Sequence, residues 1–264
     1  PHPSLNANSN VDFKVLMDMR YNIVANHPAF RGLGGVMEYN TYHADRESLV
    51  WAAKLWRHYC IEGNTSMLSE KYGFKYALDH IRNGEFDRGT DGWTLSPAAA
   101  DSMALRNMSG SGSMMHGAWP VTPGEGDDFI WMKRVAEKPN ELSQRIENLE
   151  SNRLYSVTVI TADYGDFSAG DSVEKSHAVS IEIDDAEIIP EVSFSYVKDM
   201  AGRAHPPFAP EAIPWINFHY RVFRAKGETS TLRISDWANK TEPGGPVGQE
   251  LMFGSIELAP YLED

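Results

Sequence analysis

The strongest constraint on this 264-residue chain is a two-residue alternation of side chains that recurs beyond residue 83. Residues 179–183 alternate apolar with polar side chains, and residues 216–222 carry an apolar residue at every second position. Residues i and i+2 share one face of a strand, so this rhythm indicates strands half-buried in a sheet. Gly, Pro, Asn and Asp residues punctuate the segments. The pattern predicts a mostly β chain of about eight short strands, arranged as a jelly-roll β-sandwich.

The sandwich is expected to begin at the stretch Asn83–Trp93. Its residue types suit a first strand: a glycine-containing turn, an apolar anchor at Phe86, two further glycines and a large aromatic side chain at Trp93. The sequence therefore divides into a helical, partly α/β segment (1–82) and a β-sandwich (83–264). Trp93 and Trp237 are expected in the core or packed at its edge.

The first segment predicts two helices and one strand. A helix capped by Asn10 should run over 11–26, a short strand over 36–39, and a second helix over 45–60. The expected apolar positions are Phe13, Leu16, Met17, Arg20, Ile23 and Val24 in the first helix, and Leu49, Ala52, Ala53, Trp56 and Tyr59 in the second. One strand makes no sheet, so this segment must pack on the sandwich or on material outside this chain.

Composition excludes several functions. The net charge of −13 opposes binding to a phosphate backbone and fits a neutral partner. No apolar run reaches the ~20 residues of a membrane helix. The lone Cys60 rules out an internal disulfide and a multi-cysteine zinc site. Nucleotide-binding loops, the HExxH motif and the serine nucleophile elbow are missing, so neither a cofactor nor a bound metal is expected.

Sugar recognition combines an aromatic plane with a few polar side chains. If Ile216, Phe218, Tyr220 and Val222 face the core, the other side of that strand presents Trp215, Asn217, His219 and Arg221. By the same alternation Trp131 and Arg233 point away from the core, and Trp119 lies between turn signals. These residues are the candidate ligand-binding set, provided that they share one concave sheet.

Each candidate also has a structural interpretation. Trp119 is equally compatible with a plain loop anchor, whereas a histidine such as His219 is more often hydrogen-bonded inside a sheet than in contact with a ligand. Arg221 and Arg233 are equally compatible with surface ion pairs, which contribute little to stability. The prediction of a ligand-binding surface therefore rests on the row of side chains from Trp215 to Arg221 as a whole and not on any one residue.

Two stretches of the first segment, Gly32–Tyr39 and Ala44–Thr65, resemble the last units of a (β/α)8 barrel in bacterial glycoside-hydrolase-like proteins with appended β-sandwiches. The resemblance implies a barrel domain that precedes this chain. It places Glu38 at the carboxyl end of a strand, where barrel enzymes carry catalytic groups. Glu38 is then either one carboxylate of a glycosidase pair or a structural residue.

Three later stretches, Asn83–Trp93, Leu142–Val159 and Tyr220–Trp237, resemble galactose-binding-like jelly rolls that serve as carbohydrate-binding modules. The resemblance implies a polysaccharide or glycan partner and an extracellular or periplasmic location. Such modules often hold a structural calcium near the first and last strands. Glu85 and Asp87 are candidate ligands, although Gly254–Ser255 stands where an acidic residue is expected.

The expected function is non-catalytic glycan binding, with no enzyme activity in this chain alone. Two alternatives stay open. The chain is a fragment of a glycoside hydrolase in which Glu38 is catalytic, or it is an interaction module whose aromatic side chains contact another protein.

Overall fold

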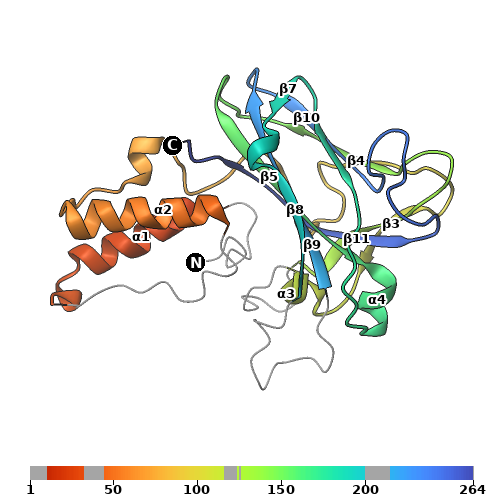
Figure 1. Cartoon of the computed structure of the whole chain (residues 1–264), viewed down its shortest axis with the longest axis horizontal. Helices are drawn as coiled ribbons and strands as arrows, with labels where there is room; N and C mark the ends of the chain where they lie inside the picture. Colours follow the sequence, from red (N-terminus) through yellow and green to blue (C-terminus); the bar gives the residue numbers. More distant parts are fainter. Residues whose placement is uncertain (1–10, 33–44, 116–123, 125, 200–214, 264) are drawn as a thin grey trace.

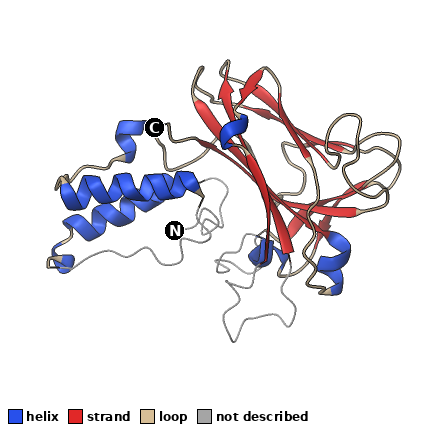
Figure 2. Ribbon diagram, in the orientation of Figure 1, coloured by secondary structure: helices blue, strands red, loops and turns tan. Residues whose placement is uncertain are grey.

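The computed structural model describes residues 11–32, 45–115, 124, 126–199 and 215–263, which form two antiparallel sheets preceded by helices (Figures 1 and 2). The four-stranded sheet has the order β1 (Thr94–Ser96), β4 (Glu141–Ile146), β10 (Ser230–Ser235) and β6 (Ser180–Ile183). The seven-stranded sheet has the order β2 (Met103–Asn107), β3 (Asp128–Lys133), β11 (Glu250–Pro260), β5 (Leu154–Asp163), β9 (Trp215–Ala225) and β7 (Ala186–Ile188), and β8 (Phe194–Asp199) also pairs with β9. The predicted mostly β, jelly-roll sandwich is confirmed.

The main core lies between the two sheets. Val157, Val159 and Phe223 of the larger sheet share one buried cluster with Leu232 and Ile234 of the smaller sheet. The burial of Leu232 and Ile234 agrees with the alternation along their strand. This cluster holds the sandwich together through burial of apolar surface.

The segment Asn83–Trp93 differs from its prediction. It forms successive turns, and the first strand begins only at Thr94. Asn83 and Phe86 adopt left-handed backbone conformations, with φ of 53° and 60°, which a strand does not allow. Phe86 and Trp93 are nonetheless buried in the main core, as expected of an anchor and a core aromatic residue. Trp237 is buried as well.

The orientation of β9 is the opposite of the prediction. Directly paired residues of antiparallel strands share a face, and Val159 pairs with His219 while Val157 pairs with Arg221. Val157 and Val159 belong to the core between the sheets. The row from Trp215 to Arg221 therefore lies on the inner face, and the set Ile216–Val222 lies on the outer face of the larger sheet.

The outer face is buried too, which explains the error. Helices α3 (Ser111–Met115) and α4 (Tyr164–Ala169) contribute Met115 and Phe167 to an outer cluster that contains Phe218. A further cluster joins Tyr220 and Val222 to Leu154. Because β9 is buried on both sides, the alternation could not tell which set faces the second sheet.

Helix α1 spans Phe13–Asn26 and helix α2 spans Arg46–Trp56, followed by a π-helical turn at Arg57–Ile61. Asp12, and not Asn10, caps α1 by accepting a hydrogen bond from the Lys14 amide. Within this helical segment, short 3₁₀ turns lie at Pro28–Phe30 and Ser69–Tyr72, and a further one lies in the sandwich at Pro190–Val192.

The buried faces of both helices agree with the prediction only in part: Phe13, Met17 and Tyr59 are buried as expected. The buried residues are Phe13, Lys14, Val15, Met17, Asp18 and Tyr21 in α1, and Glu47, Ser48, Trp51 and Leu55 in α2. Ile23 is 51% exposed, Leu49 42% and Trp56 37%, although each was expected to face the core. Buried charged side chains caused these errors, because Lys14, Asp18 and Glu47 look like a solvent-exposed face in the sequence.

The helices pack on the sandwich, one of the two expectations for this segment (Figure 1). Glu47 of α2 accepts hydrogen bonds from the Tyr220 hydroxyl and from the Leu262 amide, each at 2.7 Å. The expected strand at 36–39 and Glu38 lie outside the described residues. None of the described helices has the length and apolarity to cross a membrane.

Candidate functional site

The predicted ligand-binding residues do not form one surface. Trp131 lies on the outer face of the larger sheet and is 5% exposed. Its indole nitrogen donates to Glu250 Oε2 at 2.7 Å, and the Arg106 guanidinium lies 3.7 Å from its ring centroid. Arg106 therefore covers the aromatic plane that a sugar would need.

Arg233 lies on the smaller sheet, far from that face in the topology. It pairs with Glu141 at 2.9 Å and with Asp184 at 3.1 Å, so its guanidinium takes part in ion pairs, as the structural alternative expected. Trp119 and Glu38 lie outside the described residues.

The row on β9 is only partly accessible. Asn217 and His219 are 3% and 2% exposed, so the prediction that they line an open groove is wrong. An irregular segment, residues 171–179, crosses the inner face above them; we call it the strap. Asn217 Nδ2 donates to the Lys175 carbonyl at 2.9 Å, and Asn217 Oδ1 accepts from the His177 amide at 3.2 Å. One side chain thus fixes the strap backbone at two points.

Beneath the strap, two histidines share one hydroxyl. Thr161 Oγ1 lies 2.5 Å from His177 Nε2 and 2.9 Å from His219 Nε2, while His219 Nδ1 lies 3.2 Å from Ser195 Oγ. His177 Nδ1 is buried without a hydrogen-bond partner. One choice of tautomers gives each ring N–H of the two histidines and the Thr161 O–H an acceptor. His177 Nε2–H donates to Thr161 Oγ1, and the Thr161 hydroxyl donates to His219 Nε2. His219 Nδ1–H then donates to Ser195 Oγ. This choice leaves His177 Nδ1 as an acceptor and avoids a buried, unpaired N–H.

Both histidines are neutral over the ordinary pH range. Burial, helped by the nearby Arg134 guanidinium, lowers the pKa of His177 to about 4. Burial and the neighbouring His177 lower the pKa of His219 to about 3. The strap is therefore held by neutral hydrogen bonds at this point and not by ion pairs.

Arg221 is half-buried on β9, which pairs with β5 on one side and with β7 and β8 on the other. Its guanidinium donates to the Phe194 carbonyl at 2.9 Å and to Ser195 Oγ at 3.2 Å. Burial lowers its pKa. Arg221 therefore links β9 to β8 through hydrogen bonds, and these bonds occupy its Nη1 nitrogen.

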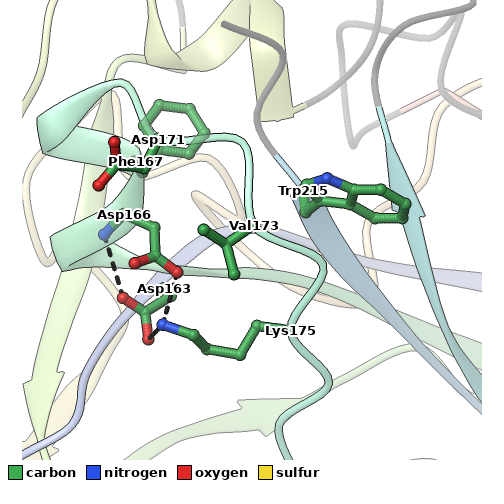
Figure 3. A pocket seen from close by; sticks show the side chains of 7 residues that line it. All are labelled: Asp163, Asp166, Phe167, Asp171, Val173, Lys175 and Trp215. Atoms are coloured by element: carbon green, nitrogen blue, oxygen red, sulfur yellow. Dashed lines mark hydrogen bonds and ion pairs between the residues drawn. The ribbon is translucent and has the colours of Figure 1, made fainter.

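Trp215 is the member of the row that stays partly exposed with polar groups around it. Figure 3 shows it at the start of β9, across a small recess from side chains carried by α4 and the strap. Lys175 Nζ lies 3.0 Å from Asp163 Oδ2 and 2.5 Å from Asp166 Oδ2 inside the recess. The other lining residues are Phe167, Asp171 and Val173.

The charges of the recess are held in place. Although burial opposes it, hydrogen bonds from Gln249, the Asp166 amide and Lys175 lower the pKa of Asp163. Burial also opposes the Lys175 charge, but Asp166 and Asp163 raise the pKa of its ammonium. The ion pairs are therefore intact near neutral pH, and they present fixed acceptors and donors beside an indole ring.

The recess is small. Its volume of about 10 Å³ admits one water molecule or one hydroxyl group and excludes a sugar ring. A ligand would lie on the exposed part of Trp215 and insert a single polar group. Trp215 was predicted from the sequence, whereas Asp163, Asp166 and Lys175 were not. No motif could have revealed these three, because the strap brings Lys175 to the end of β5 only in the folded chain.

A larger hollow of about 300 Å³ lies between α2 and the outer face of the sandwich. Its lining is Arg46, Glu47, Val50, Leu154, Ile189, Val192, Tyr261, Leu262 and Glu263. Both oxygens of Glu47 already accept hydrogen bonds from Tyr220 and Leu262. The lining combines apolar side chains with the charged side chains of Arg46, Glu47 and Glu263.

Among the described residues, no group of three or more His, Cys, Asp or Glu side chains is arranged to hold a metal ion. Asp87 Oδ1 accepts a hydrogen bond from the Gly126 amide at 2.8 Å, and Glu85 is buried.

The chain matches no family model and no curated protein sequence. It is similar to several solved structures. A family 61 carbohydrate-binding module in complex with β-1,4-galactotriose is 13% identical over 69% of this chain and 98% of its own, with a TM-score of 0.34. A putative sugar-binding protein from Bacteroides thetaiotaomicron is 12% identical over 69% of this chain and 100% of its own, with a TM-score of 0.37. A xylan-binding domain from Paenibacillus barcinonensis is 9% identical over 66% of this chain and 89% of its own, with a TM-score of 0.31. Similarities of this size identify neither the family nor the ligand of this chain.

Proposed function

We propose that this protein binds a polysaccharide or glycan without catalysis, with Trp215 as the stacking residue. The observation that carries the proposal is the placement of a partly exposed indole beside an ordered Asp163–Lys175–Asp166 ion-pair network. An aromatic ring buries the C–H face of a sugar, and charged hydrogen-bonding groups orient its hydroxyls. The recess has the volume of one such hydroxyl.

The charge of the chain narrows the ligand class. With a net charge of −13, the protein repels sulfated and uronic-acid polymers over long range. Asp163 and Asp166 are both paired with Lys175, so the recess offers hydrogen bonds and no excess of positive charge. A neutral plant or algal polysaccharide fits these conditions best.

Calorimetric titration against a panel of neutral and acidic polysaccharides tests the proposal. Binding to at least one neutral polymer is expected, with weaker or no binding to acidic polymers of similar backbone. Failure of the folded protein to bind any member of the panel would contradict the proposal.

We further propose that the chain works as the C-terminal part of a glycoside-hydrolase-like protein outside the cytoplasm. The support is apolar surface on the helices: Met19 and Ile23 of α1 are 42% and 51% exposed, and Leu49 and Trp56 of α2 are 42% and 37% exposed. A preceding barrel domain would cover such side chains. The intact mass of the native protein tests this. A secreted species several hundred residues longer supports the proposal, and a native product of 29.5 kDa contradicts it.

A further inference from the structure

Arg221 carries hydrogen-bond donors that no described residue uses. Its bonds to the Phe194 and Tyr220 carbonyls and to Ser195 Oγ all start from one atom, Nη1. Within the described ranges its Nε and Nη2 atoms have no hydrogen-bond partner, and no carboxylate pairs with its guanidinium. Neither of these two atoms is completely buried, so solvent reaches both. The side chain thus has two donors left for a ligand.

The Nε and Nη2 atoms of Arg221 form a fork. Their N–H groups lie side by side on one edge of the planar guanidinium, which suits two neighbouring oxygen atoms. The plane is held in place because Nη1 bonds to two carbonyls and a hydroxyl. Burial lowers the pKa of Arg221, but an arginine keeps its charge at ordinary pH. A half-buried charge with unused donors costs free energy, which a ligand with suitable acceptors would recover.

Ser195 adds a third donor beside the fork. Its hydroxyl oxygen lies 3.2 Å from Arg221 Nη1 and 3.2 Å from His219 Nδ1, and it accepts a hydrogen bond from each. Both lone pairs of the oxygen are then used, so the hydroxyl hydrogen is left to donate outward. Ser195 is exposed on β8, and its side chain makes no other hydrogen bond to the part of the chain that the structure describes.

These donors share the inner face of the larger sheet with Trp215. Ser195 pairs with His219, four positions along β9 from Trp215, which is about 13 Å at the rise of a strand. Between them on β8, Val197 pairs with Asn217 and is partly exposed, whereas Asn217 lies beneath the strap. A strip of accessible side chains therefore runs beside the strap from Trp215 past Val197 to Ser195.

We propose that Arg221 and Ser195 form a second subsite, which binds hydroxyl groups of the same glycan that stacks on Trp215. This inference rests on the proposed function and deepens it, because it makes the ligand a chain of several sugar units. Three donors and no acceptor select oxygen lone pairs, and neighbouring hydroxyls of one sugar ring supply two of them to the fork. The separation from Trp215 is longer than one ring, so only an oligosaccharide reaches both subsites and gains from their linkage.

A carboxylate is the other pair of oxygens that fits the fork. The net charge of −13 opposes acidic chains over long range, and Lys175 in the Trp215 recess is already paired with two carboxylates. Two neighbouring hydroxyls of a neutral sugar offer the same acceptors without this long-range repulsion. The subsite therefore takes neutral sugar units, and uronate oligosaccharides of the same length test this assignment.

Calorimetric titration with neutral oligosaccharides of one linkage, from the shortest that binds the wild type up to a hexasaccharide, tests the subsite. Arg221→Lys keeps the positive charge and removes the fork, and Ser195→Ala removes the third donor. The affinity for the hexasaccharide should fall about tenfold in Arg221→Lys and about threefold in Ser195→Ala, with little change for the shortest ligand. Arg145→Lys, at an exposed arginine of the smaller sheet, is the matched control and should bind as the wild type does. Ser195→Ala changes an exposed position, so it decides the matter even where Arg221→Lys unfolds.

The outcomes separate this inference from the proposed function. A loss confined to the longer oligosaccharides supports the second subsite, and equal losses for short and long ligands refute it. If both variants bind the hexasaccharide as tightly as the wild type while Trp215→Ala weakens binding, the subsite is refuted and glycan binding stands. If the wild-type protein binds no glycan, both fail. Tighter binding of the wild type to a uronate hexasaccharide than to the neutral one, lost in Arg221→Lys, would overturn the assignment to neutral sugars.

Discussion

The Tyr220 hydroxyl on β9 donates a hydrogen bond to the Glu47 carboxylate on α2 at 2.7 Å. Tyr220 is 8% exposed and Glu47 5%, so the bond joins the helices to the sandwich inside a buried junction. Burial together with Glu47 raises the pKa of Tyr220 well above its ordinary value, which keeps the hydroxyl protonated as a donor. Lys14 Nζ lies 3.4 Å from the other Glu47 oxygen and is fully buried.

Tyr220→Phe should lower the free energy of unfolding by about 1–3 kcal/mol, because it leaves a buried carboxylate oxygen without its donor. Chemical denaturation followed by circular dichroism measures the change. Tyr76→Phe is the matched control, since Tyr76 is 49% exposed, and it should change stability by under ~0.5 kcal/mol. Equal stability of the two variants would show that the Glu47 contact does not secure the junction.

Glu257 should make stability fall as the pH rises. It lies on the outer face of β11, where burial and the Asp12 carboxylate raise its pKa from 4.5 to about 8, against the opposing effect of Lys14. Between these two values the folded state binds a proton that the unfolded state has lost, so the stabilising effect present below pH 4.5 disappears as the pH rises toward 8. Urea titrations of the wild type and of Glu257→Gln at several pH values measure this contribution of Glu257 to the free energy of unfolding.

The comparison with Glu257→Gln removes the contributions of other groups. As the pH rises from 5 to 8.5, the free energy of unfolding of Glu257→Gln should increase relative to that of the wild type. A difference that stays constant over this range would mean that Glu257 is ionised in the folded protein.

The buried histidines should act in the opposite direction at lower pH. Their pKa values of about 4 and about 3 lie below the ordinary value of 6.5, so the unfolded chain binds protons that the folded chain excludes. Stability should therefore rise with pH up to about 6.5. His219→Gln should reduce the proton uptake on unfolding near pH 5 by about one proton, as measured by the pH dependence of the unfolding free energy. An unchanged slope would contradict a neutral, buried His219.

Thr161 should be a sensitive position because it serves both histidines. Thr161→Val keeps the shape and removes the hydroxyl, leaving two buried ring nitrogens without a partner. The expected loss is about 1–3 kcal/mol in the free energy of unfolding. Thr231→Val, on a partly exposed position of β10, is the control and should cost less than ~0.5 kcal/mol. If both variants lose the same amount, the shared hydroxyl does not anchor the strap.

The sequence was sufficient for the fold class and insufficient for the orientation of a key strand. Period-two alternation predicted the sandwich, and Phe86 and Trp93 were correctly expected in its core. On β9, however, nearly every position is buried. Alternation distinguishes the two faces of a strand only when one of them meets water. Here α3, α4 and α2 cover one face and the strap covers part of the other.

Of the residues that line the recess, the sequence predicted Trp215 as a ligand-binding residue and none of the charged ones. Trp215 was identified because an aromatic side chain stood in a polar row. Lys175 lies in a segment without regular structure, and its partner Asp163 ends a strand that otherwise reads as core. Asn217 holds the backbone of the strap that carries Lys175, and such a contact leaves no pattern in the sequence.

The measurement that bears most directly on glycan binding is a side-by-side calorimetric titration of the wild type, Trp215→Ala and Trp56→Ala with a neutral polysaccharide selected from the panel. Trp56 is a matched control because it is 37% exposed on α2, away from the recess. The account predicts that Trp215→Ala weakens binding about tenfold and that Trp56→Ala has no effect. Equal affinities for all three proteins would contradict the assignment of Trp215 as the stacking residue.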